Sequence, residues 1–289
     1  MNAHHHFARD IIALTKPKIT LMTAVLAMAG LMHAQGPIHV PEALLSIVGI
    51  ALLVSGGSAL NMYLERELDK RMVRTKDRPL PAGRLAAFWA MITGWMCAFL
   101  ALVFFYVTGN YLTLVLGVLA FYLYVFCYTP LKRRSWLALI VGSVPGAMPV
   151  VLGYTAITQA LDAKACALFL WAFLWQIPHF LAISLFRERE YTEAGFPVLS
   201  QVAHVNCAKY VLLFSSWLLV LSTASLYITG VIGEVNFFIC LAMGAMFLWV
   251  CHKGAFSQST DAWSKRAFKA SLSYQGLLFV ALIIGAVVS

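Results

Sequence analysis

The feature that most constrains this sequence is a series of apolar stretches, each long enough to cross a membrane. A transmembrane helix needs about 20 mostly apolar residues. A window of that length predicts nine spans, at residues 19–35, 42–62, 86–107, 111–128, 136–156, 163–185, 210–229, 234–252 and 270–288. Charged residues make up only 11% of the chain, whereas a soluble domain carries roughly 25%. The sequence therefore predicts an all-α protein, a polytopic bundle of nine helices in a lipid bilayer.

The positions of the basic residues predict how this bundle lies in the membrane. Of 21 Lys and Arg residues, all but Lys164 fall in the N-terminal arm or in the loops after the second, fourth, sixth and eighth predicted spans. Loops rich in Lys and Arg stay in the cytoplasm, so this alternation predicts a cytoplasmic N-terminus. The net charge of +9 does not indicate a nucleic-acid partner, because no soluble stretch is long enough to present a basic face.

The chain shows no soluble domain or linker, so residues 1–289 are expected to form one integral-membrane domain. The two longest polar segments, residues 63–85 and 186–209, each follow a span on the predicted cytoplasmic side and lie four spans apart. This spacing indicates two related four-helix halves plus a ninth helix. The N-terminus lacks an Arg- and Ser-rich presequence, which favours a bacterial inner membrane over a mitochondrial one. Function is expected in the two polar segments.

The first polar segment contains oxygen-bearing side chains at helical spacing. Asn61, Glu65 and Asp69 stand four residues apart, so on a continuous helix they form one stripe, with Glu67 on the opposite side. The chain has only 12 Asp and Glu residues, and three of them lie within positions 65–69, which favours function over simple charge balance. Such oxygens suit Mg²⁺, which takes one or two carboxylates together with water and phosphate oxygens.

Basic residues in the same segment support chemistry at a phosphate, because guanidinium and ammonium groups bind phosphate oxygens. They are Arg66, Lys70, Arg71, Arg74, Lys76 and Arg78. Topology alone also predicts Lys and Arg beside a cytoplasmic helix end, so each residue taken singly has this second explanation. The helix is expected to end near Lys76, because Pro79 and Pro81 prevent its continuation.

The second polar segment follows a span that contains two polar side chains. Gln176 and His179 lie in an otherwise apolar run, where polar groups are costly and therefore indicate function. A histidine in such a place binds haem iron, acts as a base or hydrogen-bonds a neighbouring helix, and the residues leave these three roles open. Further along, Glu190 lies at a helical step from His179 that allows it to face the first stripe with a cation between them.

These motifs resemble a known family. The pattern in the first segment is similar to the first aspartate-rich motif of the intramembrane prenyltransferases of the UbiA superfamily, on Asn61-x-x-x-Glu65-x-x-x-Asp69 and Arg74-Thr75-Lys76-Asp77-Arg78-Pro79-Leu80-Pro81-x-Gly83. A more specific resemblance is to the protohaem IX farnesyltransferases, on Trp175-Gln176-x-Pro178-His179-Phe180, Glu190-Tyr191-x-x-Ala194-Gly195 and Ala13-Leu14-Thr15-Lys16-Pro17-Lys18.

The resemblance implies an enzyme that transfers the farnesyl group of farnesyl diphosphate to a vinyl group of haem B, with addition of water, giving haem O and diphosphate. It implies Mg²⁺ as cofactor and factors of haem–copper oxidase assembly as partners. The catalytic and metal-binding residues would be Asn61, Glu65, Asp69 and Glu190. The diphosphate-binding residues would be Lys16, Arg66, Lys70, Arg71, Arg74, Lys76, Arg78 and Arg187, and the haem-binding residues Trp175, Gln176 and His179.

The sequence departs from the family pattern at two places. Glu65 stands where aspartate is usual, and Phe186 stands four residues before Glu190 where a second acid is expected. The number of metal ions at the second motif is therefore open. Two other functions compete with the first. A UbiA-type enzyme for an aromatic quinone precursor has the same diphosphate site, but residues 175–180 argue against it. A secondary transporter is disfavoured by an acidic stripe among basic residues at one face.

Overall fold

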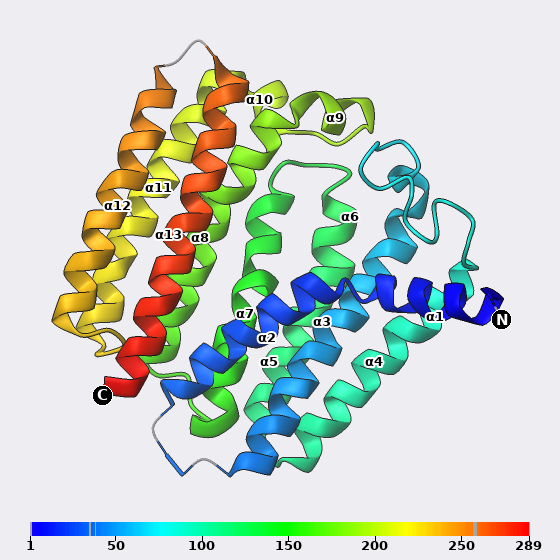
Figure 1. Cartoon of the computed structure of the whole chain (residues 1–289), viewed down its shortest axis with the longest axis horizontal. Helices are drawn as coiled ribbons and strands as arrows, with labels where there is room; N and C mark the ends of the chain where they lie inside the picture. Colours follow the sequence, from blue (N-terminus) through cyan, green and yellow to red (C-terminus); the bar gives the residue numbers. More distant parts are fainter. Residues whose placement is uncertain (1, 35, 38, 257–258, 289) are drawn as a thin grey trace.

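The structure, a computed structural model, describes residues 2–34, 36–37, 39–256 and 259–288, and within these ranges it contains helices and no strand. Figure 1 shows the long helices side by side in one bundle. They are α2 (Pro17–Met32), α3 (Val40–Asp69), α4 (Ala87–Val107), α5 (Tyr111–Tyr122) continued by a π-helix (Leu123–Tyr128) and α6 (Thr129–Leu131), α7 (Ala138–Thr158), α8 (Ala163–Phe186), α11 (Val205–Ile228), α12 (Glu234–Ala255) and α13 (Thr260–Val288). Three shorter helices are α1 (Asn2–Leu14), α9 (Glu188–Glu193) and α10 (Leu199–Val202).

The helices agree with the predicted spans. In the described residues, eight helices are long and apolar enough to cross a membrane, and α1 and α2 together form a ninth candidate that is bent by 44°. The prediction of a multi-pass all-α bundle is therefore confirmed. The loops after α3, α6 and α8, the end of α12 and the start of α13 lie at the same end of the bundle, and most of the basic residues lie in or beside them (Figure 1). That this end faces the cytoplasm stays a prediction.

The predicted end of the helix that carries Asn61, Glu65 and Asp69 is wrong. Helix α3 ends at Asp69 and not near Lys76, and turns follow it up to the start of α4. The Thr75 hydroxyl donates a hydrogen bond to the carbonyl oxygen of Asp69 at 2.9 Å, and the backbone N–H of Arg71 donates to the carbonyl oxygen of Leu68. These bonds satisfy the last carbonyl groups of the helix and bring the chain back over its end.

Glycines allow two close helix contacts that position the polar ends. A Cβ atom on Gly153 of α7 would lie 1.8 Å from the carbonyl oxygen of Ala27 of α2, and one on Gly30 would lie 1.9 Å from that of Val150. A Cβ on Gly56 of α3 would lie 2.6 Å from the carbonyl oxygen of Gly94 on α4. Small residues are what allow helix backbones to approach so closely in membranes. The contact between α2 and α7 lies near the end of α2, and Lys16 directly precedes the start of the same helix.

The apolar core has two large parts that meet at α7. One cluster joins α2, α3, α4 and α5, and the other joins α8, α11, α12 and α13. Helix α7 contributes to both, with Met148 and Leu152 in the first and Val150, Val151 and Tyr154 in the second. Two related halves stay a prediction from the sequence, but the polar ends of α3 and α8 are now placed on the two sides of this central helix (Figure 1).

Candidate functional site

The oxygen stripe of the first segment lies buried at the end of α3. Asn61, Glu65 and Asp69 are 3%, 2% and 3% exposed. The side chain of Glu67, between the last two, is 66% exposed and pairs with Lys70 at the surface. Burying ionised carboxylates is costly unless each one is paired, so the partners of the stripe are the next question.

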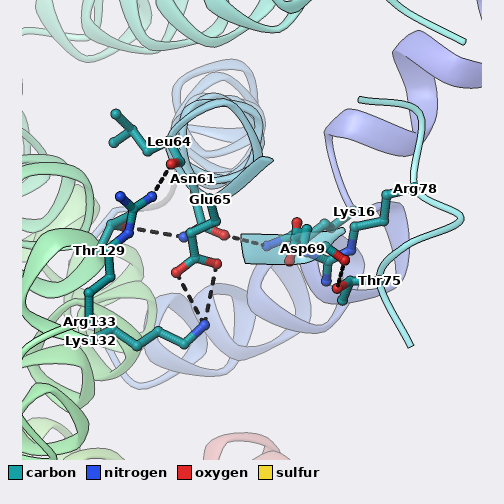
Figure 2. Close-up of polar contacts among 10 residues, drawn as sticks. All are labelled: Lys16, Asn61, Leu64, Glu65, Asp69, Thr75, Arg78, Thr129, Lys132 and Arg133. Carbon is teal, nitrogen blue, oxygen red and sulfur yellow. Dashed lines mark hydrogen bonds and ion pairs between the residues drawn. The ribbon is translucent and has the colours of Figure 1, made fainter. Parts of the chain in front are cut away.

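Each stripe residue is bonded to a different cation of the protein (Figure 2). The Lys16 ammonium donates to the amide oxygen of Asn61 at 3.0 Å. The Lys132 ammonium contacts both oxygens of Glu65, at 3.1 and 3.3 Å. The Arg78 guanidinium donates to Oδ2 of Asp69 at 2.7 Å. These cations come from the start of α2, the turn after α6 and the loop after α3, so three separate segments converge on one face of α3.

Lys132 is a site residue that the sequence reasoning missed. It counted only as one of three basic residues, Lys132 to Arg134, that mark a cytoplasmic loop. Burial disfavours its charged form, but the neighbouring Tyr128 and Glu65 outweigh burial and raise the pKa of Lys132. Its ammonium also lies 4.8 Å from the ring centre of Phe196. No signal in the sequence separates Lys132 from Arg133, whose guanidinium donates to the carbonyl oxygen of Leu64.

The other predicted diphosphate residues lie away from the stripe. Arg66 donates to the carbonyl oxygen of Tyr63 and covers its ring, and Lys70 pairs with Glu67. Arg187 pairs with Glu190 at 2.8 Å. In the described part of the chain, none of these has a hydrogen bond or ion pair to the stripe, and the same holds for the exposed Arg71, Arg74 and Lys76. Of the eight predicted diphosphate-binding residues, Lys16 and Arg78 bond to the stripe.

Glu190 lies on α9, in a segment that packs against the loop after α3. Met72 forms a small apolar cluster with Ala194 and Phe196, and this cluster joins the two polar segments. One oxygen of Glu190 accepts from Arg187, while Oε1 is buried without a hydrogen-bond partner. Among the described residues, no three His, Cys, Asp or Glu side chains are grouped closely enough to hold one metal ion. The role of Glu190 as a metal ligand stays a prediction.

The donor set of the stripe nevertheless fits a hard cation. Two carboxylates and one amide oxygen, from Glu65, Asp69 and Asn61, lie buried on one helix face. Mg²⁺ is usually bound by one or two carboxylates, with substrate phosphates and water completing its coordination. In this structure the same oxygens are bonded to Lys16, Lys132 and Arg78. The unpartnered oxygen of Glu190 is a further acceptor near the same end.

The three predicted haem-binding residues lie on α8 and contact its neighbours. His179 is 8% exposed, and its ring stacks on Trp175 with 4.5 Å between ring centres. Nδ1 of His179 lies 2.9 Å from the hydroxyl oxygen of Ser271 on α13. The indole N–H of Trp175 donates to the carbonyl oxygen of Ser271, and Gln176 donates to that of Ser143 on α7. Helix α13, to which the sequence assigned no role, thus contacts two of the three.

Residues 20–273 match the UbiA prenyltransferase family, and this match covers most of the chain. The chain belongs to the UbiA prenyltransferase family. A relative in Anaeromyxobacter sp. (strain Fw109-5), named protohaem IX farnesyltransferase, is 38% identical to this UbiA-family chain over 97% of its length and 94% of the relative's. The predicted family is therefore confirmed, and the chain is a prenyltransferase.

Solved structures support the same fold for this UbiA-family member. A digeranylgeranylglyceryl phosphate synthase structure matches with a TM-score of 0.82 at 16% identity, covering 98% of this chain and 99% of that one. A UbiA homologue from Archaeoglobus fulgidus, solved with GPP and Mg²⁺ bound, matches with a TM-score of 0.66 at 15% identity, over 94% of this chain and 99% of that one. At these identities the likeness concerns the fold.

Proposed function

We propose that this UbiA-family enzyme transfers the farnesyl group of farnesyl diphosphate to a vinyl group of haem B, with addition of water, to give haem O and diphosphate. One structural observation carries the proposal: a buried stripe of three oxygen donors, each bonded to a cation, at the polar end of a membrane bundle. The relative that is 38% identical is named protohaem IX farnesyltransferase, which supports the choice of donor and acceptor.

The diphosphate would bind beside Asn61, Glu65 and Asp69. Lys16, Lys132 and Arg78 would turn from these side chains to the phosphate oxygens, where ammonium and guanidinium groups form strong charged hydrogen bonds. Because these three cations come from three segments that meet at the stripe, they would together stabilise the negative charge that develops as the carbon–oxygen bond breaks.

The stripe would also hold Mg²⁺ together with the diphosphate, as the bound Mg²⁺ in the Archaeoglobus fulgidus homologue supports. When bound, Mg²⁺ would supply further neutralisation of the departing diphosphate. Asn61, Glu65 and Asp69 would provide the protein oxygens. Glu190 would stand near the diphosphate through the apolar contact of its segment with Met72, and its buried Oε1 would be a further hydrogen-bond acceptor there.

Aromatic rings beside the stripe would shelter the allylic cation from water. The rings of Tyr124 and Tyr128 stack with 5.5 Å between their centres. They lie next to Thr129, whose hydroxyl donates to the carbonyl oxygen of Tyr124 and accepts from the side-chain amide of Asn61. An aromatic face attracts a cation, most strongly where water is excluded. A haem vinyl group would attack the farnesyl carbon, and water would then add to the new cation.

Haem B would be held at α8, with His179 as ligand of its iron and Trp175 and Gln176 beside it. Imidazole is a common axial ligand of haem iron, and His179 is a buried imidazole in an apolar span. The bacterial relative supports a location in the bacterial inner membrane. The distribution of Lys and Arg predicts that the stripe would lie on the cytoplasmic side. A factor of haem–copper oxidase assembly would then receive haem O.

The test is to incubate the purified protein with labelled farnesyl diphosphate, Mg²⁺ and haem B, and to separate the products. Label in a hydroxyethylfarnesyl haem is the expected result. Label in an added phenolic quinone precursor and none in haem would indicate the rival UbiA-type function. Uptake of substrate into proteoliposomes with no covalent product would indicate a transporter.

A further inference from the structure

Ser271 lies at the centre of the contact between α8 and α13. It is completely buried, and it bonds to two of the proposed haem-binding residues at once. Its carbonyl oxygen accepts from the indole N–H of Trp175 at 2.9 Å, and its hydroxyl oxygen lies 2.9 Å from Nδ1 of His179. Trp175 and His179 stand one helical turn apart on α8, so one residue of α13 bonds to both rings of the stack.

The hydrogen-bond count at Ser271 determines where His179 holds its proton. A hydroxyl group has one hydrogen to donate and two lone pairs that accept. Ser271 donates its hydrogen to the carbonyl oxygen of Phe268 at 2.7 Å. With its hydrogen directed to Phe268, the hydroxyl acts as an acceptor toward His179, and this assigns the donor role to Nδ1. A neutral imidazole has a single N–H, so with that hydrogen on Nδ1 the lone pair is on Nε2.

The surroundings of His179 keep the ring in this orientation. The ring of Trp175 stacks on the imidazole with 4.5 Å between ring centres. The ring of Phe268, on α13, has its centre 4.9 Å from that of the imidazole. Within the described residues, Nε2 has no hydrogen-bond partner. A histidine that ligates a metal donates its other N–H to a fixed acceptor, which sets the tautomer and the direction of the lone pair. The group formed by Trp175, His179 and Ser271 has this arrangement without a metal.

We infer that Ser271 is a positioning residue, which fixes His179 as the Nδ1–H tautomer and so presents Nε2 as the ligand of the haem iron. This inference rests on the proposed function, since it takes haem B as the molecule bound at Nε2. It assigns a role to the ninth span: α13 orients His179 on α8, while the proposed diphosphate site is built from the start of α2, from α3 and the loop after it, and from the turn after α6.

The first measurement is the tautomer, observed without haem. Nitrogen NMR of protein labelled with ¹⁵N-histidine distinguishes a protonated ring nitrogen from a bare one, and His179→Ala identifies the resonances among the eight histidines. The expected result is a proton on Nδ1 of His179 in the wild type, and exchange between both tautomers in Ser271→Ala. Ser264→Ala is the matched control, because Ser264 is another completely buried serine of α13 whose hydroxyl bonds only to backbone carbonyl oxygens.

The second measurement is a titration with haem B followed by absorption spectroscopy. Loss of the partner of a metal-ligating histidine typically weakens metal binding by about 10-fold to 100-fold, so Ser271→Ala should weaken haem binding by at least about tenfold. His179→Ala should abolish the spectrum of histidine-ligated iron, and Ser264→Ala should match the wild type. A proton on Nε2 in the wild type, or a Ser271→Ala protein with wild-type tautomer and haem affinity, would overturn the inference.

The two measurements separate this inference from the proposed function. If the wild-type protein forms haem O but His179→Ala keeps a histidine-ligated spectrum, the inference fails and the proposed function stands. If the wild-type protein does not prenylate haem B, the proposed function fails, and with it the assignment of haem iron to Nε2. The tautomer measurement still decides in that case whether Ser271 orients His179.

Discussion

At the scale of single residues, the pairing of each stripe oxygen with a cation determines what a ligand of this site must do. Glu65 and Asp69 are buried, and without Lys132 and Arg78 their charges would be uncompensated. A ligand that takes these carboxylates must therefore offer the displaced cations new partners. A diphosphate with a divalent cation does both, because it brings positive charge to the carboxylates and oxygens to the ammonium and guanidinium groups.

Asp69→Asn tests the acidic stripe directly. The substitution keeps the shape of the side chain and removes the charge that pairs with Arg78 at 2.7 Å. We expect the rate of farnesyl transfer to fall on the order of 100-fold or more, as for loss of a key electrostatic group in other active sites. Haem binding should be unchanged, because His179 and Ser271 lie on other helices. The control is Glu67→Gln, which removes an exposed charge two residues away; equal losses in both variants would exclude a special role for Asp69.

Lys132→Met tests the cation that the sequence reasoning missed. Removing one partner of a buried ion pair typically costs about 3–5 kcal/mol, and since the Lys132 side chain is 25% exposed we expect the lower part of that range. The double variant Lys132→Met/Glu65→Gln should recover most of this stability but not the affinity for farnesyl diphosphate. Unfolding in detergent and KM measure the two effects. Arg134→Met, an exposed neighbour, is the control, and a Lys132→Met enzyme with normal KM would contradict the role.

The residues show what a single sequence can predict about this site and what it cannot. The spacing of Asn61, Glu65 and Asp69 is local, and a helix places them on one face whatever surrounds it. Lys132 reaches Glu65 across 67 positions of sequence. Nothing near Lys132 in the chain indicates that contact. Arg133 and Arg134 are also basic and directly follow it, so the sequence does not distinguish the three.

At the scale of helices, apolar length predicts where spans lie but not where their polar ends stop. The hydrocarbon thickness of the membrane determines how long a span must be. Contacts in the folded protein determine the residue at which the helix ends. Helix α3 ends at Asp69 because Thr75 and Arg78 bond to that residue from the following loop. The early end places Arg78 on the stripe and leaves Lys76 exposed.

The crossing of α2 and α7 gives a prediction at this scale. A Cβ atom on Gly153 would overlap the carbonyl oxygen of Ala27, so Gly153→Ala must push α2 away from α7. We expect a loss of about 1–3 kcal/mol in stability, and a higher KM for farnesyl diphosphate because Lys16 begins α2. Gly276→Ala on α13 is the matched control, since nothing lies within 4 Å of its Cβ position. Equal thermal unfolding temperatures of the two variants would show that the close crossing of α2 and α7 does not contribute to stability.

At the scale of the whole molecule, the distribution of charge predicts an orientation. The loops after α3, α6 and α8 lie at one end together with the end of α12, and the loop between α7 and α8 lies at the other (Figure 1). In a cysteine-free variant, Arg189→Cys should react with a membrane-impermeant maleimide only after cells are opened, and Ala160→Cys should react in intact cells; both positions are exposed. The reverse pattern would place the stripe outside the cytoplasm.

The bundle as a whole also predicts that Mg²⁺ and diphosphate bind together. Mg²⁺ alone would displace Lys16, Lys132 and Arg78 from the stripe and leave three cations around a divalent ion. Diphosphate alone would place its negative charge beside Glu65 and Asp69. Each ligand removes the repulsion that the other meets, so the binding of one favours the other, and the effect is reciprocal. Since the cations come from three segments, this coupling depends on the folded bundle and not on α3 alone.

Calorimetry with a farnesyl thiodiphosphate that does not ionise measures this coupling. We expect the affinity for Mg²⁺ to rise by about tenfold or more when the analogue is present, within the usual range for coupled sites. In Lys132→Met/Glu65→Gln the gain should shrink, because one displaced cation and one competing carboxylate are gone together. Equal Mg²⁺ affinity with and without the analogue would mean that the three cations do not block the stripe. It would also mean that their contacts with Asn61, Glu65 and Asp69 persist when the ligand binds.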